Sequence, residues 1–273
     1  MTKDEHTMTN ENDLSAESIA RSLGTHLIAR RVSFYDQAAS TNDLARERAE
    51  AGEPEGTLVI ADEQTAGRGR LGRSWIAPAH SSILMSLILR PSLEPGQLAR
   101  VTMALALATC DGIYSTTGRE AQIKWPNDIL LRGRKCGGIL AEASTTGERV
   151  EYVIAGLGLN VNFAARAVEG IPADATTLSD ELGREVPRVS LAQAILRATE
   201  RYYLTVQAGE EIHKAWLARL VTLNQRVRAQ TPWGAEEGLA EDFDPEGALL
   251  LRRSDGSLIR LLAGDVTLST REQ

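Results

Sequence analysis

The sequence predicts an α+β fold: one mixed or antiparallel sheet with helices packed on it, followed by a small C-terminal β-barrel. Three observations support this prediction. The chain of 273 residues, 42% of them hydrophobic, is long enough for one large domain and a small one. Residues 14–222 contain both helical and strand-like segments. After Leu223 these give way to short alternating runs, so we expect a domain boundary there.

The helices of the larger domain are predicted from apolar spacing and from capping residues. Asn12-Asp13 precede the first helix, Ser40 opens the second, and Pro95-Gly96 start a long apolar one. The expected helices span residues 14–23, 40–51, 95–116, 177–182, 191–207 and 210–221.

The strands of the larger domain are predicted from apolar runs that end at turn residues. Ser82 to Leu89 is the most apolar of these runs, and Pro91 stops it. A turn around Thr146-Gly147 joins the last two strands. The expected strands span residues 31–35, 57–61, 82–89, 122–125, 129–131, 136–143 and 150–161.

The C-terminal segment, residues 223–273, has the pattern of a small all-β domain. Its alternating runs are separated by turn sequences, of which Asp255-Gly256 is a typical hairpin turn. The expected strands span residues 226–229, 237–241, 248–252, 258–261 and 266–269. Several short strands within about fifty residues indicate a barrel.

Composition narrows the function classes. No apolar run reaches membrane-spanning length, so we expect no membrane partners. Residues 1–13 are polar and acidic and resemble a disordered tail rather than a signal peptide, so we expect a cytoplasmic protein. A net charge of −7 argues against a general nucleic-acid binder. Cys110 and Cys136 form no metal-binding pair, and we expect both to be unreactive. Metalloprotease and serine-hydrolase motifs are absent from the sequence.

The stretch AGRGRLGRSW, residues 66–75, matches the spacing of a dinucleotide-binding turn but lacks its context. That turn leads into a helix, whereas Pro78 and an apolar strand follow here, and a phosphate-binding Gly-Lys-Ser/Thr is also missing. Glycines can turn backbone N–H groups toward an anion, and Arg68, Arg70 and Arg73 add cations. We therefore predict an anion-binding loop, with an arginine-rich surface turn as the alternative.

Two lysine motifs follow, in a chain with 26 arginines and only four lysines. In KWPND, residues 124–128, Pro126 keeps the preceding residue extended, so Lys124 stands at a strand end beside a polar turn. In RKCGGILAE, residues 134–142, Lys135 precedes two glycines that allow a ligand to come close. Each motif alone is equally consistent with an ordinary strand end.

The stretch GLGLNVNF, residues 156–163, has two different faces. Gly156, Gly158, Asn160 and Asn162 share one face of a strand, and apolar residues share the other. A strand face without side chains makes room for something, so we expect a ligand across it, with sheet-on-helix packing as the alternative.

Together these motifs resemble the biotin protein ligase family. The resemblance rests on Ser40 to Asn42, Gln64 with GRGRLGR, KWPND, KCGGIL and GLGLN, in the family's order, and it extends to about Leu268. It implies that the C-terminal barrel is SH3-like. Each motif alone is weak, but the set is specific.

The resemblance implies a two-step reaction. The carboxylate of biotin attacks the α-phosphate of ATP, and a lysine of a biotin carboxyl carrier protein then attacks the biotinyl-AMP formed. Mg²⁺ is expected with the nucleotide. A carboxylate that approaches a polyphosphate meets like-charge repulsion, so a site with fixed cations suits this chemistry.

The resemblance also implies residue roles. Lys135 and Arg70 would be catalytic, and Asp128 would be a candidate Mg²⁺ ligand. Biotin would contact Ser40, Thr41, Asn42, Gln64, Arg68, Gly69, Arg70 and Lys135. ATP or the adenylate would contact Arg68, Arg73, Lys124, Asn127, Asp128 and Asn160. The glycine loop would order over the reactive adenylate and shield it from water.

Two departures and several alternatives accompany the resemblance. The family often has an arginine where Leu71 stands, which reduces the charge of the loop. Some members carry an N-terminal DNA-binding domain, but about thirty residues precede the first body strand here, so DNA binding and repression are not expected. The alternatives are a lipoate or octanoate protein ligase, with the same fold and adenylate chemistry, and a non-catalytic DNA-binding regulator. Both a monomer and a homodimer remain possible.

Overall fold

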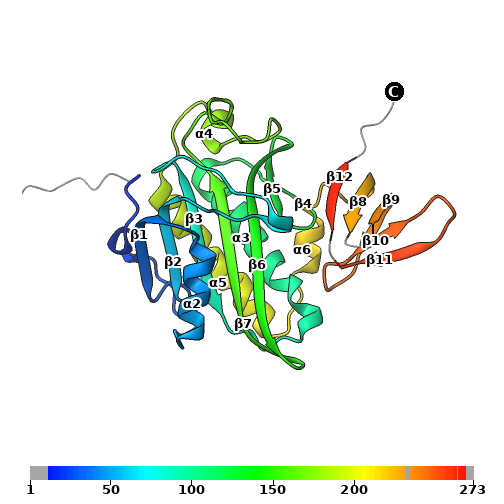
Figure 1. Ribbon diagram of the computed structural model, residues 1–273, viewed down its shortest axis with the longest axis horizontal. Coiled ribbons are helices and arrows are strands. Elements are labelled where there is room, and N and C mark those ends of the chain that lie inside the picture. The colour runs from blue at the N-terminus through cyan, green and yellow to red at the C-terminus, as the bar shows by residue number, and fades with distance from the viewer. Residues whose placement is uncertain (1–11, 232–233, 263, 269–273) are drawn as a thin grey trace, which may run out of the picture.

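The computed structural model describes residues 12–231, 234–262 and 264–268 of the chain. Its strands form two sheets, a seven-stranded sheet in the larger part and a five-stranded sheet near the C-terminus (Figure 1). The predicted α+β fold is therefore confirmed. Of the expected tail, residues 1–13, only Asn12 and Asp13 lie within the described residues; Asn12 Nδ2 donates to Glu185 Oε2 at 3.1 Å.

The main sheet is mixed, with the order β1-β2-β3-β7-β6-β5-β4. Its strands are β1 (Val32–Ala38), β2 (Leu58–Gln64), β3 (Ser82–Leu89), β4 (Gln122–Lys124), β5 (Asp128–Leu131), β6 (Arg134–Thr146) and β7 (Arg149–Asn160). Only the β1–β2 pair is parallel; the other neighbours are antiparallel. Each predicted strand of the larger domain is present. The long β6–β7 hairpin brings the GG of KCGGIL beside the GLGL run, with Gly138 opposite Gly158.

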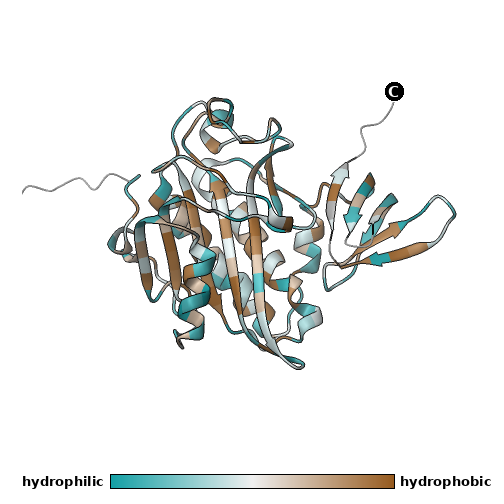
Figure 2. Cartoon of the chain, in the orientation of Figure 1, coloured by the Kyte–Doolittle hydropathy of each residue, from teal (hydrophilic) through white to brown (hydrophobic). Residues whose placement is uncertain are grey.

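Helices cover both faces of this sheet. The helices are α1 (Ala16–Ala20), α2 (Thr41–Glu50), α3 (Ala99–Thr117), α4 (Leu178–Leu182), α5 (Arg188–Gln207) and α6 (His213–Leu217). The long helices α3 and α5 lie together behind the sheet, and α2 lies in front of β2 and β3 (Figure 1). Apolar side chains therefore occupy both faces, and β2 and β3 are largely hydrophobic (Figure 2). No helix in the described part of the chain is long and apolar enough to cross a membrane.

The predicted helix 210–221 is much shorter in the structure, where α6 covers only His213–Leu217. The segment after it instead runs beside β4. The N–H of Ile123 donates to the carbonyl of Arg219 at 2.8 Å, and the N–H of Val221 donates to the carbonyl of Ile123 at 2.9 Å. These hydrogen bonds pair the backbone groups at the outer edge of β4. Such a contact between distant segments cannot be predicted from the local periodicity of the sequence.

The second sheet is antiparallel, with the order β11-β10-β9-β8-β12. Its strands are β8 (Arg226–Thr231), β9 (Gly234–Phe243), β10 (Leu249–Arg252), β11 (Leu258–Leu261) and β12 (Asp265–Leu268). All five predicted strands are present. Among the described residues β11 and β12 are the two edges of this sheet, so the closure that would make it a barrel is not part of what the structure describes.

Trp125 joins the second sheet to the main one. Its indole N–H donates to the carbonyl of Gly247 at 2.9 Å, and its backbone N–H donates to Thr222 Oγ1 at 3.0 Å. Its ring packs against Phe243, which also meets Trp216 edge-on with ring centres 5.4 Å apart. The KWPND turn is thus supported from behind by the C-terminal sheet, so the second sheet helps to place one side of the site.

Both cysteines are free and buried. Burial raises the pKa of the Cys110 thiol to about 12, and it also raises that of Cys136. Burial together with a raised pKa disfavours the reactive thiolate, which supports the prediction that both cysteines are unreactive.

Candidate functional site

One pocket of about 430 Å³ lies where the glycine loop, the KWPND turn, β6 and β7 meet. This volume suits a ligand of drug or cofactor size. Every site residue predicted from the sequence lines the pocket: Ser40, Thr41, Asn42, Gln64, Arg68, Gly69, Arg70, Arg73, Lys124, Asn127, Asp128, Lys135 and Asn160. Residues far apart in the sequence are thus brought to one cavity, although the role of each is not decided by its place in the wall.

The inner end of the pocket is built on the N-terminus of α2. Ser40 is the N-cap residue, as predicted, but its hydroxyl makes no capping hydrogen bond. Gln64 supplies the cap instead, because its Oε1 accepts from the N–H of Thr41 at 2.7 Å. Since Oε1 is held in this way, the amide nitrogen is the end of Gln64 left for a ligand in the cavity that this residue lines.

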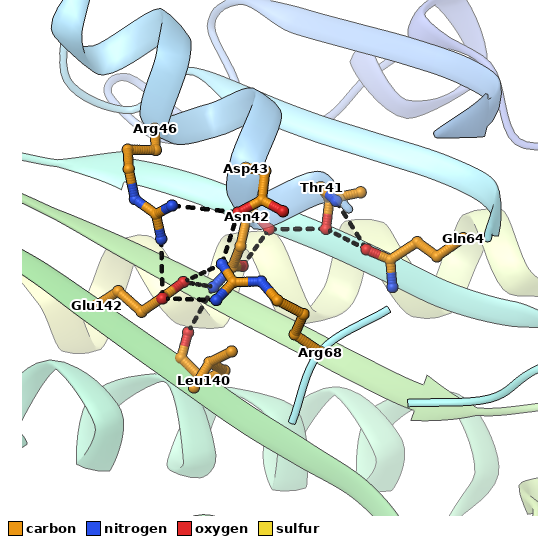
Figure 3. Close-up of polar contacts among 9 residues, drawn as sticks. Thr41, Asn42, Asp43, Arg46, Gln64, Arg68, Leu140 and Glu142 are labelled. Carbon is orange, nitrogen blue, oxygen red and sulfur yellow. Dashed lines mark hydrogen bonds and ion pairs between the residues drawn. The ribbon is translucent and has the colours of Figure 1, made fainter. Parts of the chain in front are cut away.

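Asn42 is buried at this end, and its amide is fixed on both sides. Its Nδ2 donates to the carbonyl of Leu140 at 3.2 Å and to Glu142 Oε2 at 2.7 Å, while its Oδ1 accepts from Ser86 Oγ at 2.6 Å (Figure 3). Both amide hydrogens are used, and one lone pair of Oδ1 remains. Asn42 therefore offers the pocket a hydrogen-bond acceptor.

The glycine loop folds back on itself in a narrow turn. The N–H of Gly69 donates to the carbonyl of Arg73 at 2.7 Å, and that of Trp75 donates to Gly67 at 2.8 Å. A Cβ on Gly67 would lie 2.6 Å from the carbonyl oxygen of Trp75, and Gly72 has a φ of +73°. Gly67 is required because the backbone of Trp75 comes too close for a side chain, and Gly72 is required because its backbone is left-handed. Neither constraint acts on Gly69.

The prediction that the N–H groups of this loop point toward an anion is wrong for three of them. Those of Gly69, Arg73 and Trp75 donate to carbonyls inside the loop and do not face a ligand. The cationic side chains of the loop remain as groups that would meet an anion. Arg70 reaches across the pocket, with its guanidinium 3.2 Å from Asn127 Oδ1.

Arg68 lies against two carboxylates, those of Asp43 and Glu142. Its guanidinium lies 2.7 Å from Asp43 Oδ1 and 2.9 Å from Glu142 Oε2 (Figure 3). Burial alone would lower the pKa of Arg68, but the hydrogen bond to Glu142 is the largest influence, and the net shift is upward. Its charge is already balanced by these partners, so Arg68 ties the loop to α2 and β6.

Lys135 and Asp128 form an ion pair in the pocket wall, with Nζ 2.5 Å from Oδ1. The two residues come from neighbouring strands, β6 and β5. The backbone of Lys135 also pairs with the loop that follows β7, because its carbonyl accepts from the N–H of Thr176 at 2.7 Å. The lysine is thus held at a fixed place beside a carboxylate and is one-third exposed.

The bare face of β7 is occupied by side chains from the pocket wall. A Cβ on Gly156 would lie 2.0 Å from Asn42 Oδ1, and one on Gly158 would lie 2.5 Å from the Trp75 ring. The sequence predicted a ligand across this face; at both glycines the structure places side chains of the protein itself there, and both glycines also line the cavity. Asn162 departs from the prediction, since β7 ends at Asn160 and the Asn162 amide bonds to the backbone of Val186 at both ends.

Asn160 and Trp75 present polar atoms that lack a partner within the described part of the structure. Asn160 Nδ2 donates to the carbonyl of Thr176 at 3.2 Å, but its Oδ1 is buried without a hydrogen bond. The indole N–H of Trp75 is also buried without one. Both residues line the pocket, and unpaired buried polar groups are costly.

Sequence reasoning missed three parts of the pocket wall. Trp75 follows the arginine–glycine motif directly, and this adjacency was the available signal. The loop after β7 contributes residues 170–172, 174 and 175 to the pocket wall. The second sheet contributes Val266 and Thr267. The loop and the sheet have no local motif, since tertiary structure alone brings them to the cavity.

The pocket offers little to a resident metal ion. No three His, Cys, Asp or Glu side chains gather as a metal site within the described residues. Asp128 and Asp174 line the pocket, and Lys135 already neutralises Asp128. Mg²⁺ typically takes one or two protein carboxylates together with phosphates and water. These residues fit a cation that arrives with a phosphate ligand.

Comparison with known proteins gives one consistent result. Residues 34–160 match the Biotin/lipoate A/B protein ligase family, and residues 222–269 match the Biotin protein ligase C terminal domain. The chain is 36% identical to the bifunctional ligase/repressor BirA of Bacillus subtilis, over 93% of this chain and 79% of that protein. It is also 36% identical to the biotin--[acetyl-CoA-carboxylase] ligase of Mycobacterium tuberculosis, over 95% of this chain and 98% of that one.

A solved structure has the same fold over nearly the whole chain. The biotin protein ligase from Aquifex aeolicus, in complex with biotin and ATP, superposes with a TM-score of 0.76 at 25% identity. The match covers 89% of this chain and all of that one.

Proposed function

This chain belongs to the biotin protein ligase family, and from that premise we propose that its 430 Å³ pocket is where biotin and ATP react. The chain is a ligase that activates biotin with ATP and transfers it to a protein. The observation that carries the proposal is the convergence of the arginine–glycine loop, KWPND, KCGGIL and GLGLN on one cavity. Besides Arg68, four cationic residues line its wall (Arg70, Arg73, Lys124 and Lys135), and this charge suits two anionic substrates.

In the first step, a carboxylate oxygen of biotin attacks the α-phosphorus of ATP. A new oxygen–phosphorus bond forms, the bond to the β-phosphate oxygen breaks, and pyrophosphate leaves. Lys135 would hold the biotin carboxylate and then the charge of the five-coordinate phosphorus, with Arg70 on the opposite side. The ion pair with Asp128 holds the Lys135 side chain in place, which matches a role in charge stabilisation.

In the second step, the amine of an acceptor lysine attacks the carbonyl carbon of biotinyl-AMP. An amide bond forms, AMP leaves and the amine loses a proton. The mixed anhydride would hydrolyse in water, so the glycine loop would have to cover it until the acceptor arrives. Arg68 anchors this loop to α2 and β6, which gives the covering a fixed position.

The inner end of the pocket complements a cyclic urea. Such a ring presents one carbonyl acceptor and two N–H donors. Asn42 offers an acceptor and Gln64 an amide donor, with the Ser40 and Thr41 hydroxyls beside them. A dithiolane or a plain alkyl chain would leave these buried groups unpaired, and sites of this kind discriminate strongly against such analogues. This favours biotin over lipoate and octanoate.

Mg²⁺ and the acceptor complete the proposal. Mg²⁺ would be held chiefly by the phosphates of ATP, with Asp128 as one protein ligand, and would neutralise phosphate charge. The acceptor would be a biotin carboxyl carrier domain of the kind that the name of the Mycobacterium tuberculosis relative implies. We place the reaction in the cytoplasm, where ATP is available.

Exchange of pyrophosphate into ATP tests the first step. The purified protein is incubated with labelled pyrophosphate, ATP, Mg²⁺ and either biotin, lipoate or octanoate. We expect exchange with biotin alone, and loss of exchange when Mg²⁺ is chelated. Exchange with lipoate or octanoate instead would refute the proposed substrate, and exchange with none of them would refute the proposed site.

A further inference from the structure

Glu142 on β6 connects two parts of the pocket that the proposed reaction uses separately. Its Oε2 accepts from Asn42 Nδ2 at 2.7 Å, and both of its oxygens accept from Arg68 at 2.9 and 3.0 Å (Figure 3). Its Oε1 also lies 2.8 Å from Arg46. Glu142 thus contacts the inner end of the pocket and the glycine loop at once, without lining the cavity itself.

Glu142 is one of two acceptors that orient the Asn42 amide, the other being the carbonyl of Leu140, and the contact with Glu142 is the shorter of the two. A carboxylate can only accept hydrogen bonds, so it holds the amide nitrogen toward itself and leaves Oδ1 toward Ser86 and the pocket. A neutral amide in place of Glu142 would accept or donate equally well. Only the longer contact with the Leu140 carbonyl would then oppose a flip of the Asn42 amide, and a flipped Asn42 would present a donor where a urea N–H requires an acceptor.

Glu142 also holds the glycine loop through Arg68. Burial raises the pKa of Glu142, but hydrogen bonds from Asn42 and Arg68 and the charge of Arg46 outweigh it, so the net pKa lies below its usual value. The carboxylate is therefore charged at neutral pH. Asp43 is a second partner of Arg68 at 2.7 Å, but no hydrogen bond joins the Asp43 side chain to Asn42 within the described structure.

We propose that Glu142 is a positioning residue that couples recognition of the biotin ring to closure of the glycine loop. This inference rests on the proposed function. If Glu142 had a purely structural role, loss of its charge would chiefly destabilise the fold. Its ion pairs, however, join side chains that are one-quarter to two-fifths exposed, and such pairs contribute little to stability. Loss of the charge should therefore affect biotin affinity much more than folding.

The experiment compares Glu142→Gln with the wild type in pyrophosphate exchange, titrating biotin and ATP separately. We expect the KM for biotin to rise tenfold or more, the KM for ATP to change less than threefold, and the melting temperature to change by less than about 4 °C. Glu142→Asp keeps the charge and should recover part of the biotin affinity. Trypsin should cleave the loop of Glu142→Gln faster than that of the wild type, even with biotin present.

Two control variants separate the parts of this inference. Glu151→Gln makes the same change on β7 beside the distant Arg149, and it should leave exchange and cleavage unchanged. Asp43→Asn weakens the Arg68 anchor but leaves the Asn42 contact in place, so it should speed cleavage while the KM for biotin stays within threefold.

Two results would overturn the inference while the proposed function stands. One is an unchanged KM for biotin in Glu142→Gln. The other is a parallel loss of biotin affinity, ATP affinity and thermal stability, which would indicate a structural role only. If the wild type itself fails to exchange with biotin, the proposed function fails, and this inference with it.

Discussion

Replacing Gly156 with alanine tests whether the bare face of β7 exists to accommodate Asn42. The added Cβ would lie 2.0 Å from Asn42 Oδ1 and 2.9 Å from its Cγ. Real Cβ atoms essentially never come within 3.0 Å of another heavy atom, so the amide has to move by at least an ångström. Gly156 lies on a strand between β3 and β6, so the backbone cannot yield instead.

The cost follows from the hydrogen bonds of Asn42. Its bonds to Ser86, Leu140 and Glu142 span 2.6 to 3.2 Å, and a shift of an ångström breaks those that it lengthens. Buried groups left unpaired cost about 1–3 kcal/mol each, so we expect a loss of roughly 2–4 kcal/mol in the free energy of unfolding. Misplacement of a binding group by an ångström costs about 100-fold in rate, so kcat/KM for biotin should fall by about that factor.

The assay combines thermal unfolding with biotin-dependent pyrophosphate exchange. A loss of this size lowers the melting temperature by roughly 5–15 °C in a protein of this length. Gly96→Ala is the matched control, because a Cβ there meets no atom within 4 Å and no positive φ is involved; it should leave both measurements unchanged. In an Asn42→Ala background, Gly156→Ala should cost less than about 1 kcal/mol, because the clash is gone.

The reasoning would be refuted by a Gly156→Ala protein that melts within 2 °C of the wild type and keeps its KM for biotin within threefold. It would also be refuted if the cost were the same with and without Asn42. In that case the loss would come from the strand itself and not from the side chain that lies across it.

Three further predictions concern other residues. Lys135→Ala should lower the rate of pyrophosphate exchange by about 100-fold or more, since it removes a charge contact and leaves Asp128 unpaired, while circular dichroism stays native. Arg188→Met should cost about 3–5 kcal/mol in urea unfolding, because the buried carboxylate of Asp62 loses the guanidinium that lies 2.7 Å from its Oδ1 and retains His80, at its Oδ2, as the remaining side-chain partner; a loss below about 1 kcal/mol would contradict this. Burial raises the pKa of Glu200, but hydrogen bonds from three backbone N–H groups hold this pKa below the ordinary 4.5 in the folded protein. The charged carboxylate therefore stabilises the fold fully above about pH 4.5, and this contribution is lost as the pH falls through the lowered pKa of the folded state. The stability difference between wild type and Glu200→Gln in urea should therefore shrink below about pH 4.5, and a difference that grows toward acid would refute the sign.

The sequence determined most of the elements, because their signals are local. Apolar runs bounded by proline and glycine predicted the strands of the main sheet, and alternation with turn residues predicted those of the second. The helix expected over residues 210–221 failed because those residues pair with the edge of β4, a contact between distant parts of the chain.

The candidate residues of the site were also predictable, because their motifs are short and contiguous. All of them line one pocket, but the sequence alone could not assign their partners. Arg68 was expected to contact biotin and the adenylate, and nothing in the sequence indicated the two carboxylates, Asp43 and Glu142, between which its guanidinium lies. Its surroundings depend on α2 and β6, which lie tens of residues away on either side.

What the sequence by itself determined was the fold class and the set of chemical groups that the site contains. Only the tertiary structure decided how those groups are oriented. Gly156 and Gly158 of β7 cannot carry a side chain because Asn42 and Trp75 lie across their face of the strand. Packing alone makes Trp75, Glu142 and the second sheet part of the site. Hydrogen bonds and ion pairs act over about 3 Å in space, so their partners are set by how the chain folds and not by separation along it.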